Sequence, residues 1–295
     1  MRITSRMLMQ NMLNNLSRNN QRLAHVSQQL ATGKRINKPS DDPGDVVRSL
    51  RVRTEVNEIK QYRKNIDTAR SILEYSDELL DKIGHAIHRA MELSVQALND
   101  TYDGSQRKMM AKEVNGILED MLINSNSTFA NRYIFAGTYT EPPFEAVRDG
   151  GLITEIIFHG NQDPKPFEMG IGQTMDTGMK GEDIFNPVFQ GLMSLRDGLN
   201  SGDRNAIEEG YTDVKKAFEN LLMERAALGA RLNQLELTSE RMAAAEFNLI
   251  RLQIEVEDVD MYEAVMKLKD IEALHQASLN VTARIIQPTL VDYLR

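Results

Sequence analysis

Hydrophobic residues recur at alternating steps of three and four along most of this chain, the spacing typical of helices that pack along a seam. The longest series runs from Ile59 to Ala97 over five heptads without a proline. Its members, all broadly apolar except for two serines, are Ile59, Tyr62, Ile66, Ala69, Leu73, Ser76, Leu80, Ile83, Ile87, Ala90, Ser94 and Ala97. One helix of this length would extend ~58 Å at 1.5 Å per residue. We therefore expect a helical rod in which other long helices cover this seam.

The N-terminal region predicts a helix from Ser5 to Thr32. Gly33 follows it, and glycine commonly ends helices because it tolerates the left-handed conformation. The seam of this helix, with one polar member, is Met9, Met12, Leu16, Asn19, Leu23, Val26 and Leu30. Asp42 is a good N-cap and Pro43 suits the first helical position, so the long helix should begin there.

The C-terminal half supplies a partner for the long seam, because apolar residues alternate by three and four from Tyr211 to Met242 and, after a shift of one step, as far as Val256. A last helix should start after Asp260, where Glu263 completes a capping-box pattern. Its seam is Met261, Ala264, Leu268, Ile271, His275, Ser278 and Thr282, and a second stripe is Leu274, Ala277, Val281 and Ile285. A helix that is apolar in two directions needs more than one neighbour.

The composition changes between residues 131 and 186, which contain 8 of the 18 glycines and 4 of the 8 prolines. Short strands are predicted at residues 132–136, 153–159 and 167–171, and a short helix is predicted after Pro187. The predicted fold class is therefore mainly α, a long antiparallel coiled-coil or helical-bundle rod with a small β-rich inserted domain.

Composition and charge exclude several classes of function. Cysteine is absent, which excludes disulfides and a cysteine nucleophile. No apolar run is long enough for a membrane helix, and no secretory signal peptide is evident. The net charge of -8 is uneven, because residues 1–40 contain seven basic residues and no acidic one. This basic start fits either a targeting segment or a solvated helix, and without interleaved aromatic residues it does not indicate nucleic-acid binding. We expect neither a membrane nor a nucleic acid as a partner.

Few residues could carry catalysis. His85 and His88 lie three apart on one predicted helix and could share a metal ion, but they flank the seam and no further ligand cluster accompanies them. Gly170 and Gly172 lack the third glycine of a dinucleotide-binding loop, and the acidic residues between 255 and 260 lack the pattern of a calcium loop and fit a helix junction better. We expect no enzyme activity, no cofactor and no metal, and a function through surface contacts.

Three stretches resemble the flagellin superfamily. Residues 1–4 and 30–43 resemble its N-terminal signature, and residues 285–295, with Pro288 and a closing leucine-arginine pair, resemble its C-terminus. Residues 130–144, ANRYIFAGTYTEPPF, are similar to the hook-filament junction members of that superfamily, whereas flagellins usually have Asn-Gly after the phenylalanine.

This resemblance implies a division of the chain into three parts. Residues 1–42 with 257–295 would form terminal coiled-coil helices in the inner layer of a tubular polymer, residues 43–130 with 187–256 a helical-bundle rod, and residues 131–186 an outward β-rich insertion. We expect the terminal seams to be buried against neighbouring subunits. The expected assembly interface is Met9, Met12, Leu16, Leu23, Val26, Leu30, Leu268, Ile271, Val281, Ile285, Leu290, Val291 and Leu294.

The resemblance also implies the partners and the location. The chain would form a junction layer in the bacterial flagellum, between the first hook-associated protein and the flagellin filament. Copies of itself and, before secretion, a cytoplasmic export chaperone would be further partners. It would leave the cell through the flagellar export apparatus, which agrees with the missing signal peptide, and would reside outside the cell at the hook-filament junction.

Three alternatives are open at this point. A flagellin filament subunit would have the same termini, although the short insertion and the Tyr-Ile-Phe-Ala-Gly segment argue against it. An intracellular coiled-coil adaptor or a chemoreceptor-like signalling hairpin would have the same seams. A metalloenzyme would use His85 and His88.

Overall fold

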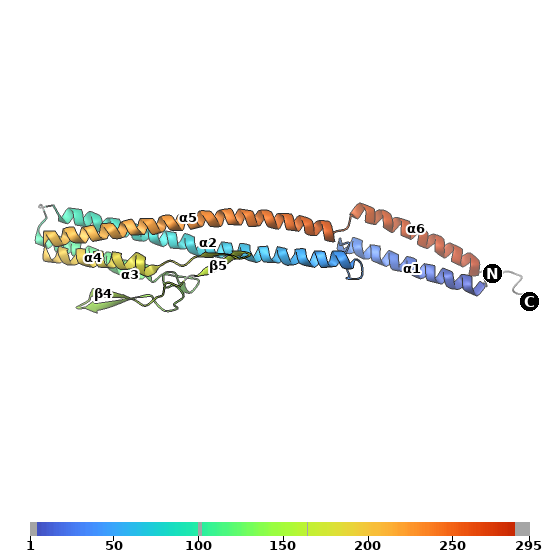
Figure 1. Cartoon of the computed structure of the whole chain (residues 1–295), viewed down its shortest axis with the longest axis horizontal. Coiled ribbons are helices and arrows are strands. Elements are labelled where there is room, and N and C mark those ends of the chain that lie inside the picture. The colour runs from blue at the N-terminus through green and yellow to red at the C-terminus, as the bar shows by residue number, and fades with distance from the viewer. Residues whose placement is uncertain (1–4, 100–101, 164, 287–295) are drawn as a thin grey trace, which may run out of the picture. The chain divides into compact units, whose positions relative to one another are not determined.

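The computed structural model describes residues 5–99, 102–163 and 165–286. The helices are α1 (Ser5–Thr32), α2 (Pro43–Ala97), α3 (Gly104–Ser125), α4 (Gly181–Ser201), α5 (Arg204–Glu257) and α6 (Met261–Ile286), shown in Figure 1. The strands are β1 (Thr128–Phe129), β2 (Arg132–Tyr133), β3 (Phe144–Asp149), β4 (Leu152–Phe158), β5 (Pro166–Gly170) and β6 (Gln173–Asp176). The expectation of a mainly helical fold with a small β-rich insertion is confirmed.

The chain divides into two compact units, to which α2 and α5 both contribute. The terminal unit consists of Met1–Glu58 and Ala245–Arg295, and the central unit consists of Ile59–Ala244. The expected three-part division of the chain stays a prediction, and the two units are described separately below.

Helix boundaries in the terminal unit follow the local sequence. Gly33 has a φ of 69°, the left-handed conformation that ends α1. The side chain of Asp42 accepts hydrogen bonds from the backbone N–H groups of Gly44 and Asp45, both at 3.1 Å, and so caps α2. In the loop between the helices, Asp41 accepts backbone hydrogen bonds from Asn37 and Lys38. The sequence therefore determines both helix ends through contacts within a few residues.

The core of the central unit contains the long seam of α2. Its positions from Ile66 to Ala97 are fully buried and contribute to two hydrophobic clusters, one shared with Leu221 and Leu228 of α5 and the other with Leu235. In this unit α5 runs beside α2, with α3 and α4 alongside (Figure 1). The two serines of the seam donate hydrogen bonds within α2, Ser76 to the carbonyl of Ile72 and Ser94 to that of Ala90. Because their hydroxyls are satisfied in this way, they are tolerated in an apolar core.

The insertion contains three antiparallel hairpins, β1–β2, β3–β4 and β5–β6. The predicted strands at residues 153–159 and 167–171 correspond to β4 and β5 within one residue. The strand predicted at residues 132–136 ends at Tyr133, and the next three residues enter the core without strand pairing. Phe135 packs edge-on against Phe185 of α4, with ring centroids 4.8 Å apart. Strands β1, β3 and β6 were not predicted.

Helix α4 starts at Gly181, before the helix predicted to follow Pro187. Pro187 lies inside the helix, where proline removes a backbone hydrogen bond. Ile184 and Phe185, in the turns before it, are buried in the central core, and this burial offsets the lost bond.

Candidate assembly surface

Helices α1 and α6 pack against each other in the terminal unit (Figure 1), and most positions of their predicted seams are buried or half-buried. Val26 and Ala264 are buried, and Leu16, Leu23, Leu30, Leu268 and Ile271 are half-buried. The polar member of the α1 seam, Asn19, donates a hydrogen bond of 3.2 Å to Ser278 of α6. The polar positions of the two seams therefore meet each other.

Burial in this helix pair is incomplete. Of the apolar side chains described in α1 and α6, Val26 and Ala264 are the buried ones, although the helices contain 28 and 26 residues. By contrast, the 21 residues of α4 include seven buried apolar side chains between Ile184 and Leu199. The pair therefore covers far less apolar surface than a core helix of the same chain.

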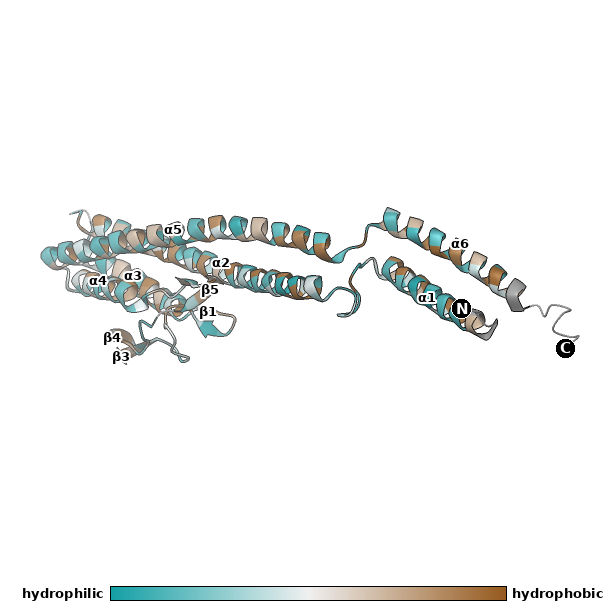
Figure 2. Cartoon of the chain, turned by 45° about the vertical axis from the view of Figure 1, so that its right-hand side comes forward, coloured by the Kyte–Doolittle hydropathy of each residue, from teal (hydrophilic) through white to brown (hydrophobic). Residues whose placement is uncertain are grey.

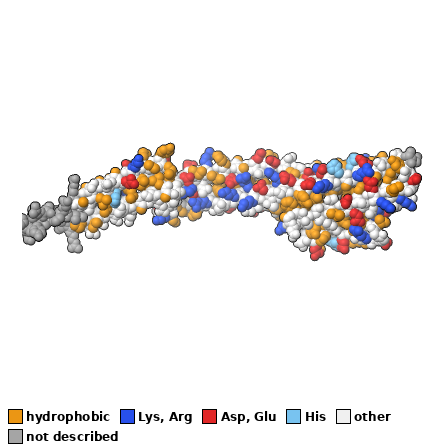
Figure 3. Space-filling view, turned by 180° about the vertical axis from the view of Figure 1, so that it is seen from behind, with side chains coloured by type: hydrophobic (Ala, Val, Ile, Leu, Met, Phe, Trp, Pro, Cys, Tyr) orange, Lys and Arg blue, Asp and Glu red, His pale blue; other side chains and the backbone are white. Residues whose placement is uncertain are grey.

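Large apolar side chains are exposed on both helices. Figure 2 shows hydrophobic residues along both helices, and the face drawn in Figure 3 shows hydrophobic side chains at the surface of the pair. The exposed set is Met7, Met9 and Leu13 of α1, and Met261, Tyr262, Val265, Met266, Leu274, Leu279 and Val281 of α6. Groups of large exposed apolar side chains are typical of interaction surfaces.

The predicted interface residues fall into three groups. Met12, Leu16, Leu23, Val26, Leu30, Leu268 and Ile271 lie fully or partly between the two helices, and Met9 and Val281 are exposed by 41% and 48%. Ile285 lies in α6, but its side chain is outside the described part, as are residues Leu290, Val291 and Leu294. The spacing thus identified residues of two faces, and their role in assembly stays a prediction.

A buried carboxylate joins the end of α5 to the first turns of α2. The side chain of Glu257 is 1% exposed and accepts hydrogen bonds from Arg53 Nε at 2.5 Å, Arg53 Nη2 at 2.8 Å and Ser49 Oγ at 2.7 Å. The hydrogen bonds from Arg53 hold the pKa of Glu257 at about 2, against an ordinary value of 4.5. Burial acts in the opposite direction, and the bonds from Ser49 and Gln253 add to the lowering. Glu257 is therefore ionised at neutral pH.

Backbone contacts next to this carboxylate tie the α1–α2 loop to the α5–α6 turn. The N–H of Arg35 donates to the carbonyl of Glu257 at 2.7 Å, and the N–H of Val259 donates to the carbonyl of Gly33 at 3.1 Å. Lys34 Nζ lies 2.6 Å from Asp258 Oδ1. Sequence reasoning identified the acidic residues as a helix junction but missed the Arg53 partner, because 204 positions separate the two residues.

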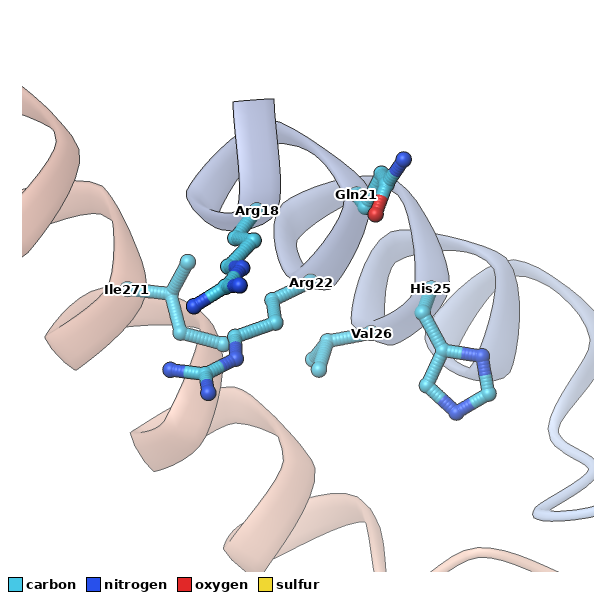
Figure 4. Close-up of a pocket in the computed structure, with 6 residues that line it drawn as sticks. All are labelled: Arg18, Gln21, Arg22, His25, Val26 and Ile271. Atoms are coloured by element: carbon cyan, nitrogen blue, oxygen red, sulfur yellow. The ribbon is translucent and has the colours of Figure 1, made fainter. Parts of the chain in front are cut away.

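A groove lined by basic residues lies along one side of the helix pair. Its lining residues are Arg18, Gln21, Arg22, His25 and Val26 of α1 and Ile271 of α6. Figure 4 shows the guanidinium groups of Arg18 and Arg22 on the side of Ile271, with the imidazole of His25 further along α1. We call this the basic groove.

A second groove on the pair has a different character. It is lined by Leu23 of α1 and by Glu272, His275, Gln276 and Leu279 of α6. The Nδ1 atom of His275 is buried here and has no hydrogen-bond partner among the described residues. We call this the acidic groove, after Glu272.

The two histidines considered as metal ligands do not converge. His85 lies 3.5 Å from Asp81, and His88 lies 3.5 Å from Glu92, so each faces a separate carboxylate. Across residues 5–99, 102–163 and 165–286, no cluster of three or more His, Asp or Glu side chains could hold a metal ion. Nor is any helix in these ranges long and apolar enough to cross a membrane.

Comparison with known proteins gives the family. Residues 3–140 match the bacterial flagellin N-terminal helical region, and residues 211–294 match the bacterial flagellin C-terminal helical region. Together these matches cover well over half of the chain.

Individual relatives agree with these matches. The flagellar hook-associated protein 3 of Salmonella typhimurium is 26% identical, over 94% of this chain and 95% of its own. The flagellin of Bacillus subtilis is 25% identical over 97% of each. The solved structure of Bacillus cereus FlgL has a TM-score of 0.60 at 20% identity and covers 69% of this chain and 99% of its own, a likeness of fold. The chain belongs to the flagellin superfamily and is a structural component of the bacterial flagellum.

Proposed function

We propose that this protein forms the junction layer between a hook-associated protein and the flagellin filament, and that it assembles by burying the terminal helices α1 and α6 against neighbouring subunits. The main observation that supports this proposal is the incomplete burial of these two helices within one chain. Each CH2 group removed from water contributes ~0.8 kcal/mol, so the exposed side chains represent a large reserve of binding free energy.

The three parts expected from the resemblance fit this role. Residues 1–42 with 257–295 would form the inner layer, residues 43–130 with 187–256 the surrounding helical bundle, and residues 131–186 the outer insertion. The contact of Glu257 with Arg53 lies next to the proposed boundary between the first two parts, where it holds α2 to α5 before the chain passes to α1 and α6.

The proposed partners are those of a subunit in a mixed polymer. They are copies of this chain, the first hook-associated protein and flagellin, with an export chaperone bound before secretion through the flagellar export apparatus. We infer that the protein acts by binding and not as an enzyme, because the relatives that it matches are structural proteins of the flagellum.

A filament subunit is the second candidate, since the relatives include a flagellin of nearly equal length. Chain length therefore does not distinguish a junction protein from a filament subunit. The resemblance of residues 130–144 to junction members of the superfamily favours the junction role. In this segment Phe135 is buried, and the φ of Gly137 is 64° where an added Cβ would lie 2.2 Å from the carbonyl oxygen of Asn161. Residues 134–137 of this segment are thus fixed in the core.

Deletion of the gene followed by electron microscopy tests the proposal. The junction role predicts hooks that lack filaments, with flagellin released into the medium. Loss of filament protein alone, or purified protein that polymerises by itself into long filaments, would favour the filament subunit.

Hydrogen exchange tests the role of the terminal helices. In dilute monomer we expect amides 10–30 to exchange quickly, and in the assembled flagellum to be protected, because their burial depends on neighbours. Strong protection of these amides in the monomer would contradict assembly-dependent burial.

A further inference from the structure

The basic groove contains two arginines without a counter-charge. Among the described residues, Arg18 and Arg22 are exposed and take part in no ion pair. Residues 1–40 contain no acidic side chain, so α1 itself cannot neutralise them. The floor of the groove is apolar, formed by Val26 and Ile271.

The acidic groove carries the complementary charge. Glu272 is exposed and makes no ion pair within the described residues, in contrast to Glu263, which pairs with Lys267 at 2.7 Å. Leu279 lies two turns further along α6 and is 45% exposed. This groove therefore presents one carboxylate beside an apolar side chain.

The two grooves lie on opposite sides of one section of the helix pair. At about 100° per residue, Arg22 and Leu23 lie on opposite sides of Val26 around the axis of α1. On α6, Ile271 lines the basic groove and Glu272 the acidic groove. The grooves share no lining residue, and both lie near the contact of Asn19 with Ser278. The basic groove of one copy and the acidic groove of a neighbouring copy can therefore meet at the same level along the axis of the helix pair.

From this arrangement we propose that the basic groove of one copy receives Glu272 and Leu279 of a second copy of this chain. Arg18 and Arg22 bind the carboxylate, and Leu279 packs on the apolar floor. The contact joins two different faces, so it repeats from copy to copy around a layer and is not closed by a dimer. This inference rests on the proposed function. It specifies which residues of α6 in one copy contact α1 in the next.

Cysteine cross-linking of the full chain tests the contact directly, because the natural sequence has no cysteine. In the variant with Arg22→Cys and Glu272→Cys, oxidation of isolated flagella should give a ladder of species larger than dimers. A bond within one copy is prevented because the two residues lie in opposite grooves. Arg22→Cys with Asp270→Cys is the matched control, since Asp270 is exposed on α6 but lines neither groove. A ladder in the control, or none in the test variant, would overturn the proposal.

Charge reversal gives an independent readout. Glu272→Lys, or Arg18→Glu with Arg22→Glu, should reduce filament-bearing hooks about ten-fold or more, because like charges then face each other across the contact. Asp270→Lys should leave them unchanged. The variant that combines all three reversals should restore assembly. Coexpression of Glu272→Lys with the Arg18→Glu and Arg22→Glu variant should also restore it, because opposite charges face each other wherever copies of the two variants alternate in the layer. Reversals without effect would refute the groove contact and leave the junction role intact, whereas hooks that keep their filaments after gene deletion would refute the junction role.

Discussion

Arg53 and Glu257 form a two-point ion pair in which Arg53 Nε lies 2.5 Å and Nη2 2.8 Å from the carboxylate oxygens of Glu257. The carboxylate is almost completely buried, whereas the guanidinium is half exposed. The pair fixes the start of α2 to the end of α5 at the place where the chain enters the terminal helices. Its strength should therefore control how firmly these helices are held.

Acid should weaken the terminal unit through Glu257. Because its pKa in the folded protein is about 2 and lies below the ordinary value of 4.5, the stabilisation is complete above pH 4.5 and is lost as the pH falls towards 2. A lowering of this size corresponds to at most about 3 kcal/mol. Urea unfolding of wild type and Glu257→Gln, followed between pH 7 and pH 2.5, should show a difference that shrinks as the solution becomes acidic. A difference that is independent of pH would contradict this assignment.

His275 should weaken the α1–α6 pair. It occupies a seam position of α6, and its buried Nδ1 lacks a partner among the described residues. An unpaired buried polar group costs about 1–3 kcal/mol, so His275→Leu should stabilise the pair by an amount in this range. Slower hydrogen exchange of amides 19–30 in the monomer would measure it. His25→Leu, a change at an exposed position of α1, should not slow exchange, and equal effects of both changes would count against a specific seam contact.

Gly181 should be essential for the central core. A Cβ at this position would lie 2.3 Å from the carbonyl oxygen of Phe135, which is backbone and cannot move aside easily. We expect Gly181→Ala to lower the free energy of unfolding by about 2 kcal/mol or more, as overpacking does. Gly229→Ala is the control, because no atom lies within 4 Å of the position that its Cβ would take and alanine favours helix by up to ~1 kcal/mol. Thermal unfolding of both variants measures the contrast, and comparable stabilities would show that the close approach is relaxed in solution.

Local sequence signals predicted most of the fold. Gly33, Asp42 and Pro43 act within a few residues, so the end of α1 and the start of α2 were placed correctly. The start of α4 was not, because the burial of Phe185 against Phe135, a residue 50 positions earlier, overrides the helix-breaking tendency of Pro187. The prediction failed where long-range packing decided the structure.

For the candidate assembly surface, too, local spacing was predictive and long-range packing was not. Helical spacing identified two apolar faces on α6, and the structure adds that the face containing Ile271 meets α1 while Leu274 and Val281 are exposed. Spacing alone cannot tell which of two faces is covered within one molecule. The grooves around Arg22 and Glu272 were likewise not predictable, since each combines residues of helices far apart in the sequence.

The exposed stripe of α6 should matter for assembly but not for the monomer. Leu274 is 57% exposed, so Leu274→Gln removes little buried apolar surface from the isolated chain and should change its free energy of unfolding by less than ~0.5 kcal/mol. In the flagellum the same side chain should be buried against a neighbour, where its loss costs about 1–2 kcal/mol per contact and is repeated in every copy. We expect normal urea unfolding of the monomer together with fewer filament-bearing hooks. Lys269→Gln, at another exposed position of α6, should leave both measurements unchanged. Normal assembly of Leu274→Gln would mean that this stripe faces solvent in the polymer, and burial of the terminal helices would then have to come from their remaining exposed residues.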